Sequence, residues 1–497
     1  MIDVPFPSDG LFTVIDDTII IDSYMEDGMR FVGRHRELTI LTAEAERLRA
    51  GEHPSGRCVM LRGRRRVGKS RLLEEFCERS GLPYAFYTAS RQGDREPSLF
   101  AGEMLESTLP GKDLFADVRV TSWDAALRLL GAALDDDTPT IVVLDEFPYL
   151  LDDQTVEGVF QKYWDRVLSK KPVLLLLVGS DLAMMDALNT YGRPLYQRGT
   201  AMVLPPLSPV ETWDIVGAKS AADAFDAYLA TGGLPMVCDD WPNGWGIWRY
   251  LKHALGESTS ALVVSGERAL AAEFPDVTQA RLVLDQIGSG ERTFANLARA
   301  GGGMTATSLT RSLDVLITKG IVAKDAPLST KRSRESRYRI TDPYLRFWLR
   351  FIGPYLAEIE RGRGDRVLSR IQRDWAVWRG RAIEPIIREA LSRLSPIAGL
   401  APAEVVGGYW TRTNVPEIDI IGADRLPVAT SIAYAGTIKW LEKTPLNQAD
   451  VNQLIIDLSR VPGASPSTPL IAVSRSGVHA AGVTVLNPDD LITAWAT

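Results

Sequence analysis

The sequence predicts an α/β protein whose first large domain contains a parallel, five-stranded β-sheet. Strands that alternate with helices form a parallel sheet with helices on both faces. The chain shows this alternation, with five short apolar runs at residues 58–61, 84–88, 141–144, 174–179 and 201–204. A hydrophobic content of 45% and a charged content of 24% exclude a disordered or collagen-like chain. The 497 residues suffice for about three domains.

A second structural pattern follows the sheet. Three helix-like pieces separated by Gly-rich turns precede two short apolar runs that flank Lys331-Arg332-Ser333-Arg334. Three helices followed by a strand pair are the layout of a winged helix-turn-helix. The predicted helices span 278–287, 293–300 and 305–319, and the predicted strands span 321–324 and 337–340.

These patterns divide the chain into six predicted segments. They are an N-terminal extension, an α/β core, a helical lid, a winged helix-turn-helix, a linker helix and a final α/β unit. The predicted bounds are 1–30, 31–204, 205–276, 277–345, 346–368 and 369–497. The lid is interrupted by Thr-Gly-Gly-Leu-Pro at 231–235, and Arg-Gly-Arg-Gly-Asp at 361–365 predicts a hinge.

The charge distribution is uneven. The whole chain has 56 Lys and Arg against 63 Asp and Glu, a net charge of −7, which by itself argues against a nucleic-acid partner. Residues 277–384, however, contain 20 Lys and Arg against 11 Asp and Glu. The sequence therefore predicts one basic region in an acidic protein.

Cysteine usage and hydropathy predict a soluble, cytoplasmic protein. Cys58, Cys77 and Cys238 lack the spacing of a zinc site or a disulfide framework. The first 13 residues lack the basic and apolar regions of a signal peptide. The longest apolar run, 173–178, is far shorter than the roughly 20 residues of a membrane span, so we expect no membrane partner.

Residues 63–70, Gly-Arg-Arg-Arg-Val-Gly-Lys-Ser, fit the phosphate-loop pattern G-x-x-x-x-G-K-[ST] between a predicted strand and a helix at 71–79. Such a loop turns its backbone amides and a helix N-terminus toward phosphate oxygens. We expect Lys69 to reach the β- and γ-phosphates and Ser70 to bind Mg²⁺. The predicted nucleotide-binding residues of this P-loop NTPase are Gly63, Arg66, Val67, Gly68, Lys69, Ser70 and Arg71.

Two carboxylates follow the predicted strand at 141–144. We expect Asp145 to order the Mg²⁺ shell and Glu146 to polarise the attacking water. Ser180, at the end of the next strand, is expected beside the γ-phosphate. Arg198 has two interpretations, an arginine finger acting on its own site or on a neighbour's in a homo-oligomer, and a surface ion pair. The predicted catalytic residues are Glu146, Lys69, Arg198 and Ser180, with ATP and Mg²⁺ as cofactors.

Several motifs together resemble those of an archaeal and bacterial ATPase family in the AAA-like STAND class. They are Phe31-Val-Gly-Arg34-x-x-Glu37-Leu38, the phosphate loop, Leu-Asp-Glu-Phe-Pro-Tyr ending at Tyr149, Val-Gly-Ser180, Pro-Leu-Tyr196 and Gly232-Gly-Leu-Pro235. The resemblance implies an additional-strand P-loop fold. It further implies that Phe31, Val32 and Arg34 lie near the adenine and that Pro235 senses the nucleotide from the lid.

The predicted helix at 305–319 has one apolar and one polar side, as a recognition helix does. We expect Thr307, Ser308 and Arg311 to face a DNA groove, and Lys331, Arg332 and Arg334 to contact phosphates. Such binding weakens steeply with salt. The alternative is a protein-contact role for the same module.

The last segment resembles the PD-(D/E)xK nuclease core that ends many members of the family. The resemblance is carried by Arg379-Gly-Arg-Ala-Ile-Glu384, Gly408-Tyr-Trp410, Glu417-Ile-Asp419-Ile-Ile-Gly422 and Gly436-Thr437-Ile-Lys439-Trp440. It implies that Glu384 and Asp419 bind a metal beside Lys439.

This segment departs from the nuclease pattern at Thr437, where the family has an acid. A neutral hydroxyl replaces a carboxylate poorly, although Glu417, on the same strand face as Asp419, offers a compensating carboxylate. We therefore favour a domain that does not cleave.

The sequence thus predicts an Mg²⁺-dependent ATPase in which ATP acts as a switch on the winged helix and the nuclease-like domain. One alternative is an ATP-gated DNA nuclease in defence or repair. Another is a nucleotide-gated transcriptional regulator or scaffold.

Overall fold

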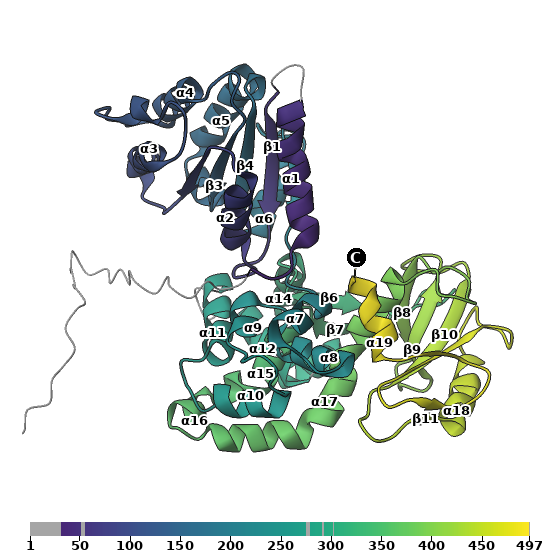
Figure 1. The fold of residues 1–497 in the computed structure, drawn as a ribbon. Coiled ribbons are helices and arrows are strands. Elements are labelled where there is room, and N and C mark those ends of the chain that lie inside the picture. The colour runs from purple at the N-terminus through teal and green to yellow at the C-terminus, as the bar shows by residue number, and fades with distance from the viewer. Residues whose placement is uncertain (1–30, 51–54, 275–278, 291–292, 302, 497) are drawn as a thin grey trace, which may run out of the picture. The chain divides into compact units, whose positions relative to one another are not determined.

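The computed structural model describes residues 31–50, 55–274, 279–290, 293–301 and 303–496 (Figure 1). The chain forms two compact units, Met1–Val32 and Gly33–Thr497. The predicted N-terminal extension at 1–30 lies outside the described residues. No helix in the part of the chain that the structure describes is long and apolar enough to cross a membrane.

The first sheet of the second unit is parallel and has the strand order β2-β3-β4-β1-β5. Its strands agree with the five predicted runs to within one residue at either end, which confirms the α/β prediction for this region. Every residue of β3 and β4 is buried, as expected for central strands with helices on both faces. The bounds are β1 Arg57–Arg62, β2 Tyr84–Thr88, β3 Thr140–Asp145, β4 Val173–Gly179 and β5 Thr200–Val203.

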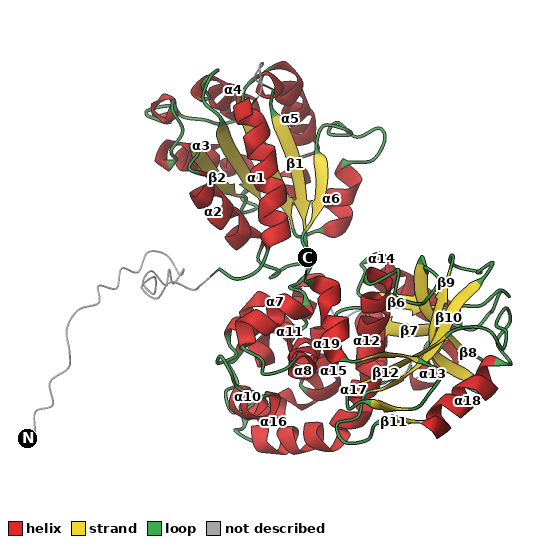
Figure 2. Cartoon of the chain, turned by 45° about the vertical axis from the view of Figure 1, so that its right-hand side comes forward, coloured by secondary structure: helices red, strands yellow, loops and turns green. Residues whose placement is uncertain are grey.

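In the part of the chain that the structure describes, six α-helices accompany this sheet (Figure 2). Helices α3, α4 and α5 pack on it through one apolar cluster, in which the rings of Phe100, Trp123 and Phe160 meet at centroid distances of 5.4 and 5.5 Å. The helices are α1 His35–Ala50, α2 Lys69–Ser80, α3 Glu96–Glu106, α4 Trp123–Ala133, α5 Gln154–Arg166 and α6 Leu182–Leu188.

The region predicted as a lid is helical, and it shares its hydrophobic core with the segment that follows it. One continuous apolar cluster runs from Leu207 to Trp375 and joins these helices to the three helices and two strands that follow. The elements are α7 Pro209–Val216, α8 Ala221–Thr231, α9 Pro235–Asp239, α10 Ile247–Ala254, α11 Ala261–Glu273, α12 Gln279–Ser289, α13 Phe294–Ala300, α14 Ala306–Thr318, β6 Val322–Asp325 and β7 Arg337–Ile340.

The loop between the antiparallel strands β6 and β7 is anchored on the C-terminal sheet. The backbone N–H of Leu328 donates to the carbonyl of Gly408 at 2.9 Å, and the side chain of Leu328 is buried in the core of that sheet. The N–H of Ala429 donates to the carbonyl of Ser329 at 3.0 Å. The start of the predicted wing is therefore fixed by the segment that follows it.

The C-terminal sheet is mixed, with the order β14-β12-β10-β9-β8. Strands β8, β9 and β10 pair antiparallel, whereas β10, β12 and β14 pair parallel. The long helix α17 begins at Gly364, inside the predicted hinge, and crosses the predicted boundary at 368 and 369, so the linker and the last unit share one helix. The elements are α15 Pro343–Phe351, α16 Leu356–Glu360, α17 Gly364–Arg393, β8 Val405–Trp410, β9 Glu417–Ala423, β10 Ile432–Lys439, β11 Leu446–Asn447, α18 Gln448–Leu458, β12 Leu470–Ser474, β13 Val478–His479, β14 Thr484–Leu486 and α19 Pro488–Ile492.

A buried ionic cluster joins α8, α17 and the end of β12. The Oδ2 atom of Asp226 lies 3.0 Å from the guanidinium nitrogens of both Arg379 and Arg475. Arg379 and Asp226 are almost fully buried, and Arg379 also contacts Glu442 at 3.1 Å. Removing one member of such a cluster leaves an uncompensated buried charge, at a cost of about 3–5 kcal/mol.

Candidate functional site

The predicted phosphate loop connects β1 to α2, which begins at Lys69. Gly68 has a φ of +86°, a backbone conformation that glycine adopts without strain. Gly63 is needed for a different reason, because a Cβ there would lie 2.7 Å from the carbonyl oxygen of Leu204. The two glycines of the motif thus allow the loop to turn tightly against β5. This turn directs the N-terminus of α2 toward the interior of the loop.

The Lys69 side chain closes this loop. Its Nζ donates to the carbonyl oxygens of Gly63 at 2.9 Å and Arg64 at 3.1 Å. Burial lowers the pKa of Lys69, whereas the nearby Glu146 and Asp145 oppose that shift. The ammonium therefore lies inside the loop with two carboxylates close enough to affect it.

Two pairs of side chains bring the phosphate loop and the neighbouring strand ends together. The Ser70 hydroxyl donates to Asp145 Oδ2 at 2.5 Å, and Asp145 is buried at the end of β3. The Ser180 hydroxyl, just beyond β4, donates to Glu146 Oε2 at 2.8 Å. Glu146 has a φ of +50°, an uncommon value for a non-glycine residue. The residues expected to bind Mg²⁺ and to polarise water thus lie in two adjacent hydrogen-bonded pairs.

The residues that the resemblance places around the adenine have separate environments. Pro235, the first residue of α9, lies beside the loop, with its Cγ 3.5 Å from where a Cβ on Gly68 would be. Arg34 is buried and donates to the carbonyls of Val67 at 2.7 Å and Pro205 at 2.8 Å. Burial lowers its pKa, against the effect of the neighbouring Glu211. Arg34 therefore braces the loop against the chain that follows β5. Phe31 and Val32 belong to the other compact unit.

Arg198 makes a two-bonded ion pair with Asp165 on α5. Its Nε and Nη2 donate to the two carboxylate oxygens at 2.7 and 2.8 Å, and its Nη1 donates to the carbonyls of Pro194 and Tyr196. This geometry corresponds to the ion-pair interpretation. An arginine finger at this position would first have to leave Asp165.

Three arginines in and just after the loop have partners that the sequence pattern did not predict. Arg64 donates to the carbonyl of Gly320 and to Thr341 Oγ1 at 3.1 Å, and lies 3.5 Å from Asp342. Arg66 donates to the carbonyl of Ser265 on α11 at 3.3 Å. Arg71 has weaker pairs with Glu74 and Glu75, both at 3.6 Å. No local signal marks such contacts, since the partners of Arg64 and Arg66 lie about 200 residues or more along the chain.

The second predicted site, on the C-terminal sheet, is arranged differently. The Oδ2 atom of Asp419 accepts hydrogen bonds from Thr437 Oγ1 at 3.0 Å and from the N–H of Ile438 at 2.8 Å. Burial and the nearby Glu384 raise the pKa of Asp419 to about 6. Glu384 itself pairs with Arg388 at 3.1 Å.

The other polar groups of this region are engaged elsewhere. Lys439 Nζ lies 2.6 Å from Asp450 on α18, a partner that the sequence analysis missed. Glu417, the carboxylate expected to compensate for Thr437, pairs with Arg337 at 2.6 Å. Among the described residues, no three His, Cys, Asp or Glu side chains form a group that could hold a metal ion.

The residues expected to contact DNA lie on α14 and on the loop between β6 and β7. Thr307 and Arg311 are exposed, and Ser308 is half-buried. Lys331, Arg332 and Arg334 are also exposed. Leu309, Leu313 and Leu316 on the opposite side of α14 are buried, as the amphipathic pattern predicts.

Comparison with known families identifies one domain. Residues 348–454 match DUF234, described as archaea bacterial proteins of unknown function. The matched residues include α17 and the strands β8 to β10. In Methanocaldococcus jannaschii, the protein MJECL04 is 26% identical over 444 residues, covering 86% of this chain and 91% of the relative. A shorter relative, MJ0424, is 36% identical over 75 residues, covering 15% of this chain and 71% of that protein.

Solved structures with a similar fold include two from archaea. The Walker-type ATPase PABY2304 of Pyrococcus abyssi has a TM-score of 0.44 and 18% identity, covering 64% of this chain and 96% of that one. The Aeropyrum pernix ORC2 protein, in its ADPNP and ADP complexes, has a TM-score of 0.46 and 16% identity, covering 70% of this chain and 98% of that one. Because these values are low, we infer function from the geometry of the site.

Proposed function

We propose that this chain is an Mg²⁺-dependent ATPase of the P-loop type. The observation that carries the proposal is the pairing of Ser70 with Asp145 and of Ser180 with Glu146 around a buried Lys69. Hydroxyl and carboxylate oxygens are the ligands that Mg²⁺ prefers, and a lysine in a loop of backbone amides suits a polyphosphate. The residues present fit both groups.

The proposed roles follow from position. Ser70 and Asp145 would hold Mg²⁺, which supplies charge neutralisation for the phosphates when bound. Lys69 would exchange its carbonyl partners for phosphate oxygens, and the loop amides would orient the chain of phosphates. Glu146 would accept a hydrogen bond from the attacking water, with Ser180 fixing the carboxylate.

Two substitutions separate binding from hydrolysis. Lys69→Ala is expected to abolish nucleotide binding, whereas Glu146→Gln keeps the shape of the site and is expected to bind ATP without hydrolysing it. Phosphate release and ATP binding are measured for both variants, with Lys252→Ala, an exposed lysine on α10, as the matched control. Equal activity of the Lys69 and Glu146 variants would refute the assigned roles.

We further propose that nucleotide state is transmitted to the basic region through the loop itself. Arg64 and Arg66 emerge from the phosphate loop and bond to Gly320, Thr341 and Ser265, which belong to the helical region and to the segment with a winged-helix layout. A change of loop conformation on binding phosphate therefore acts directly on those contacts. Thr307 and Arg311 on the exposed face of α14 would then contact DNA.

A salt series tests DNA as the partner. Binding of a labelled duplex by the full chain should weaken steeply as salt increases, because phosphate contacts release counterions. An affinity that does not change with salt would remove DNA as a partner and favour a protein partner instead.

For the C-terminal domain we propose a binding role without cleavage. Asp419 is satisfied by Thr437 and Ile438, and Lys439 is paired with Asp450. Plasmid DNA incubated with the chain and Mg²⁺ or Mn²⁺ should stay intact. Cleavage that disappears in Asp419→Ala would overturn this proposal in favour of an ATP-gated nuclease.

A further inference from the structure

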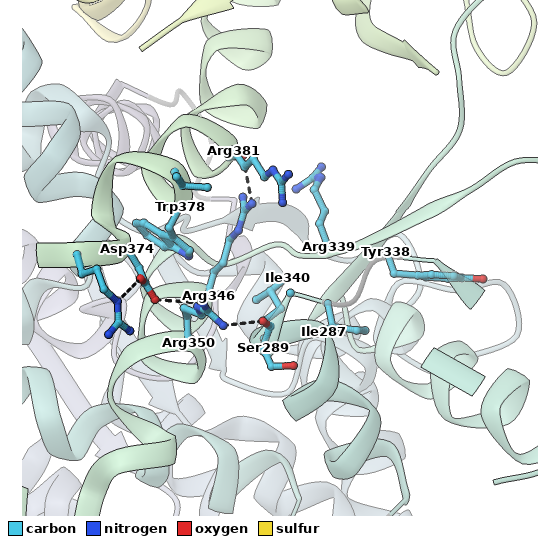
Figure 3. Close-up of a pocket in the computed structure, with 14 residues that line it drawn as sticks. Ile287, Ser289, Tyr338, Arg339, Ile340, Arg346, Arg350, Asp374, Trp378 and Arg381 are labelled. Carbon is cyan, nitrogen blue, oxygen red and sulfur yellow. Dashed lines mark hydrogen bonds and ion pairs between the residues drawn. The ribbon is translucent and has the colours of Figure 1, made fainter. Parts of the chain in front are cut away.

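A second concave site lies outside both regions described above. It is formed by the end of α12, strand β7, helix α15 and the middle of α17, and has a volume of about 330 Å³ (Figure 3). We call it the arginine cleft, because five arginines line it. They are Arg339, Arg346, Arg350, Arg373 and Arg381.

The cleft has a large excess of positive charge. Asp374 is the one carboxylate among its described lining residues. It serves two arginines at once, Arg373 at 2.9 Å and Arg350 at 3.4 Å. Arg339 has a carboxylate partner at the edge, Asp325, at 2.8 Å. Among the described residues that line the cleft, five arginines therefore stand against one carboxylate.

Neutral groups hold two of these arginines in place. Arg350 Nη1 donates to the carbonyl of Ser289 at 2.8 Å. Arg346 donates to the carbonyls of Arg381 at 3.1 Å and Ala382 at 3.4 Å. A carbonyl orients a guanidinium without cancelling its charge, so these contacts preorganise the two side chains along the wall of the cleft.

Like charges also converge in the cleft. Figure 3 shows the side chains of Arg339 and Arg381 pointing toward one another, although they come from β7 and α17. Two guanidinium groups that face each other repel, and an anion between them turns that repulsion into attraction. The Trp378 ring and Val377, which is 70% exposed, add an apolar wall to the same cleft.

We propose that the arginine cleft binds phosphate groups. Guanidinium forks match phosphate oxygens in pairs, and several positive charges in one small cleft suit a multiply charged anion better than a single carboxylate. The apolar wall suits the organic part of a phosphorylated ligand. The phosphate groups belong either to a nucleic-acid strand or to a small phosphorylated molecule. Binding of a nucleic-acid strand rests on the DNA contact proposed above, whereas binding of a small molecule does not.

The test uses the full chain in a Lys69→Ala background, so that the phosphate loop does not contribute. Pyrophosphate binding is measured by calorimetry, and binding of a fluorescein-labelled DNA duplex by anisotropy. Arg381→Gln removes one exposed guanidinium of the cleft. The matched control is Arg366→Gln, an exposed arginine on the same helix that does not line the cleft.

We expect pyrophosphate to bind the background chain and Arg381→Gln to weaken it about tenfold, the effect of losing one charge-assisted hydrogen bond. Arg366→Gln should leave the affinity unchanged. If duplex affinity falls in parallel, the phosphates belong to nucleic acid; if it does not, the ligand is a small phosphorylated molecule. No pyrophosphate binding, or equal binding by both variants, would overturn the proposal. ATP binding by the wild-type chain is measured separately, so failure of the ATPase proposal is recognised independently.

Discussion

The two sites predicted from motifs, one on each large sheet, differ in how their polar groups are used. At the first sheet, Ser70 and Asp145 contact each other across the loop and strand, as do Ser180 and Glu146. At the second sheet, Lys439 forms an ion pair with Asp450, and Glu417 forms one with Arg337. Asp419 there contacts Thr437 and lies near Glu384, but Lys439 and Glu417 pair with residues outside the predicted site.

The difference shows what a motif requires beyond its letters. In the phosphate loop, the short spacing of the glycines and of Lys69 fixes the local backbone, so the side chains have few other arrangements. In the C-terminal region, Lys439 and Glu417 pair with charged residues outside the predicted site, and Asp419 accepts hydrogen bonds from the Thr437 hydroxyl and the N–H of Ile438. A neutral Thr437 removes the negative charge that would attract a cation.

The strongest test of this contrast replaces one carboxylate in each region. Asp145→Asn should lower ATP hydrolysis by about 10³-fold, since several kcal/mol of charge stabilisation depend on the metal that it would hold. Asp419→Asn should leave hydrolysis at the wild-type rate. Steady-state phosphate release measures both, and a similar loss in the two variants would contradict the contrast.

A second substitution would sharpen the contrast by restoring the missing acid. Thr437→Glu places a carboxylate next to Asp419 and should increase Mn²⁺ affinity about tenfold, a change typical of gaining or losing one supporting group at a metal site. Electron paramagnetic resonance of free Mn²⁺ measures the binding. Thr437→Gln is the control, because glutamine has the size of glutamate without its charge. If Thr437→Gln binds Mn²⁺ as tightly as Thr437→Glu, the explanation is contradicted.

A third prediction concerns the buried carboxylate Asp226, whose role is structural. Burial raises its pKa to about 6 against the effect of Arg475 and Arg379. A carboxyl group with a higher pKa in the folded state binds its proton more tightly there, so its contribution to stability is present at low pH and is lost as the pH rises through about 6. Between pH 5 and 7 the free energy of unfolding should fall by about 1 kcal/mol in the wild type relative to Asp226→Asn.

Urea unfolding of the two chains at both pH values measures this difference. A wild-type chain that gains stability relative to Asp226→Asn as the pH rises would show that the arginines, and not burial, dominate the pKa of Asp226.

The smallest expected effect is at Arg198. Because Arg198 and Asp165 form one partly exposed ion pair, Arg198→Ala and Asp165→Asn should each cost about 0.5–1 kcal/mol of stability and change ATP hydrolysis to the same small extent. An arginine finger behaves otherwise: its loss lowers the rate by about 10³-fold or more. A large loss in Arg198→Ala alone would restore the finger interpretation.

Much of this fold could be predicted from local pattern. The central strands β3 and β4 of the first sheet are buried along their whole length, so each appears as an apolar run with turn residues at its ends. The amphipathic pattern of α14 likewise identifies which of its residues are buried.

Long-range contacts could not be predicted in this way. The bonds from Arg64 to Gly320 and from Arg379 to Asp226 join residues far apart in sequence, and an arginine has no local signal that names its partner. Helix α17 begins inside the Gly-rich stretch at 361–365 and continues through the predicted boundary at 368 and 369, because its buried contacts come from segments far away in the sequence. The arginine cleft could not be predicted either, because its arginines come from three separate elements.

The central claim is that Lys69, Ser70 and Asp145 grip a triphosphate with its metal. The most direct measurement is a calorimetric titration of the full chain with ATP in the presence of Mg²⁺, repeated with Lys69→Ala and Lys252→Ala. We predict saturable one-to-one binding by the wild type and by Lys252→Ala, and none by Lys69→Ala. Absence of binding by the wild type, or undiminished binding by Lys69→Ala, would contradict the account.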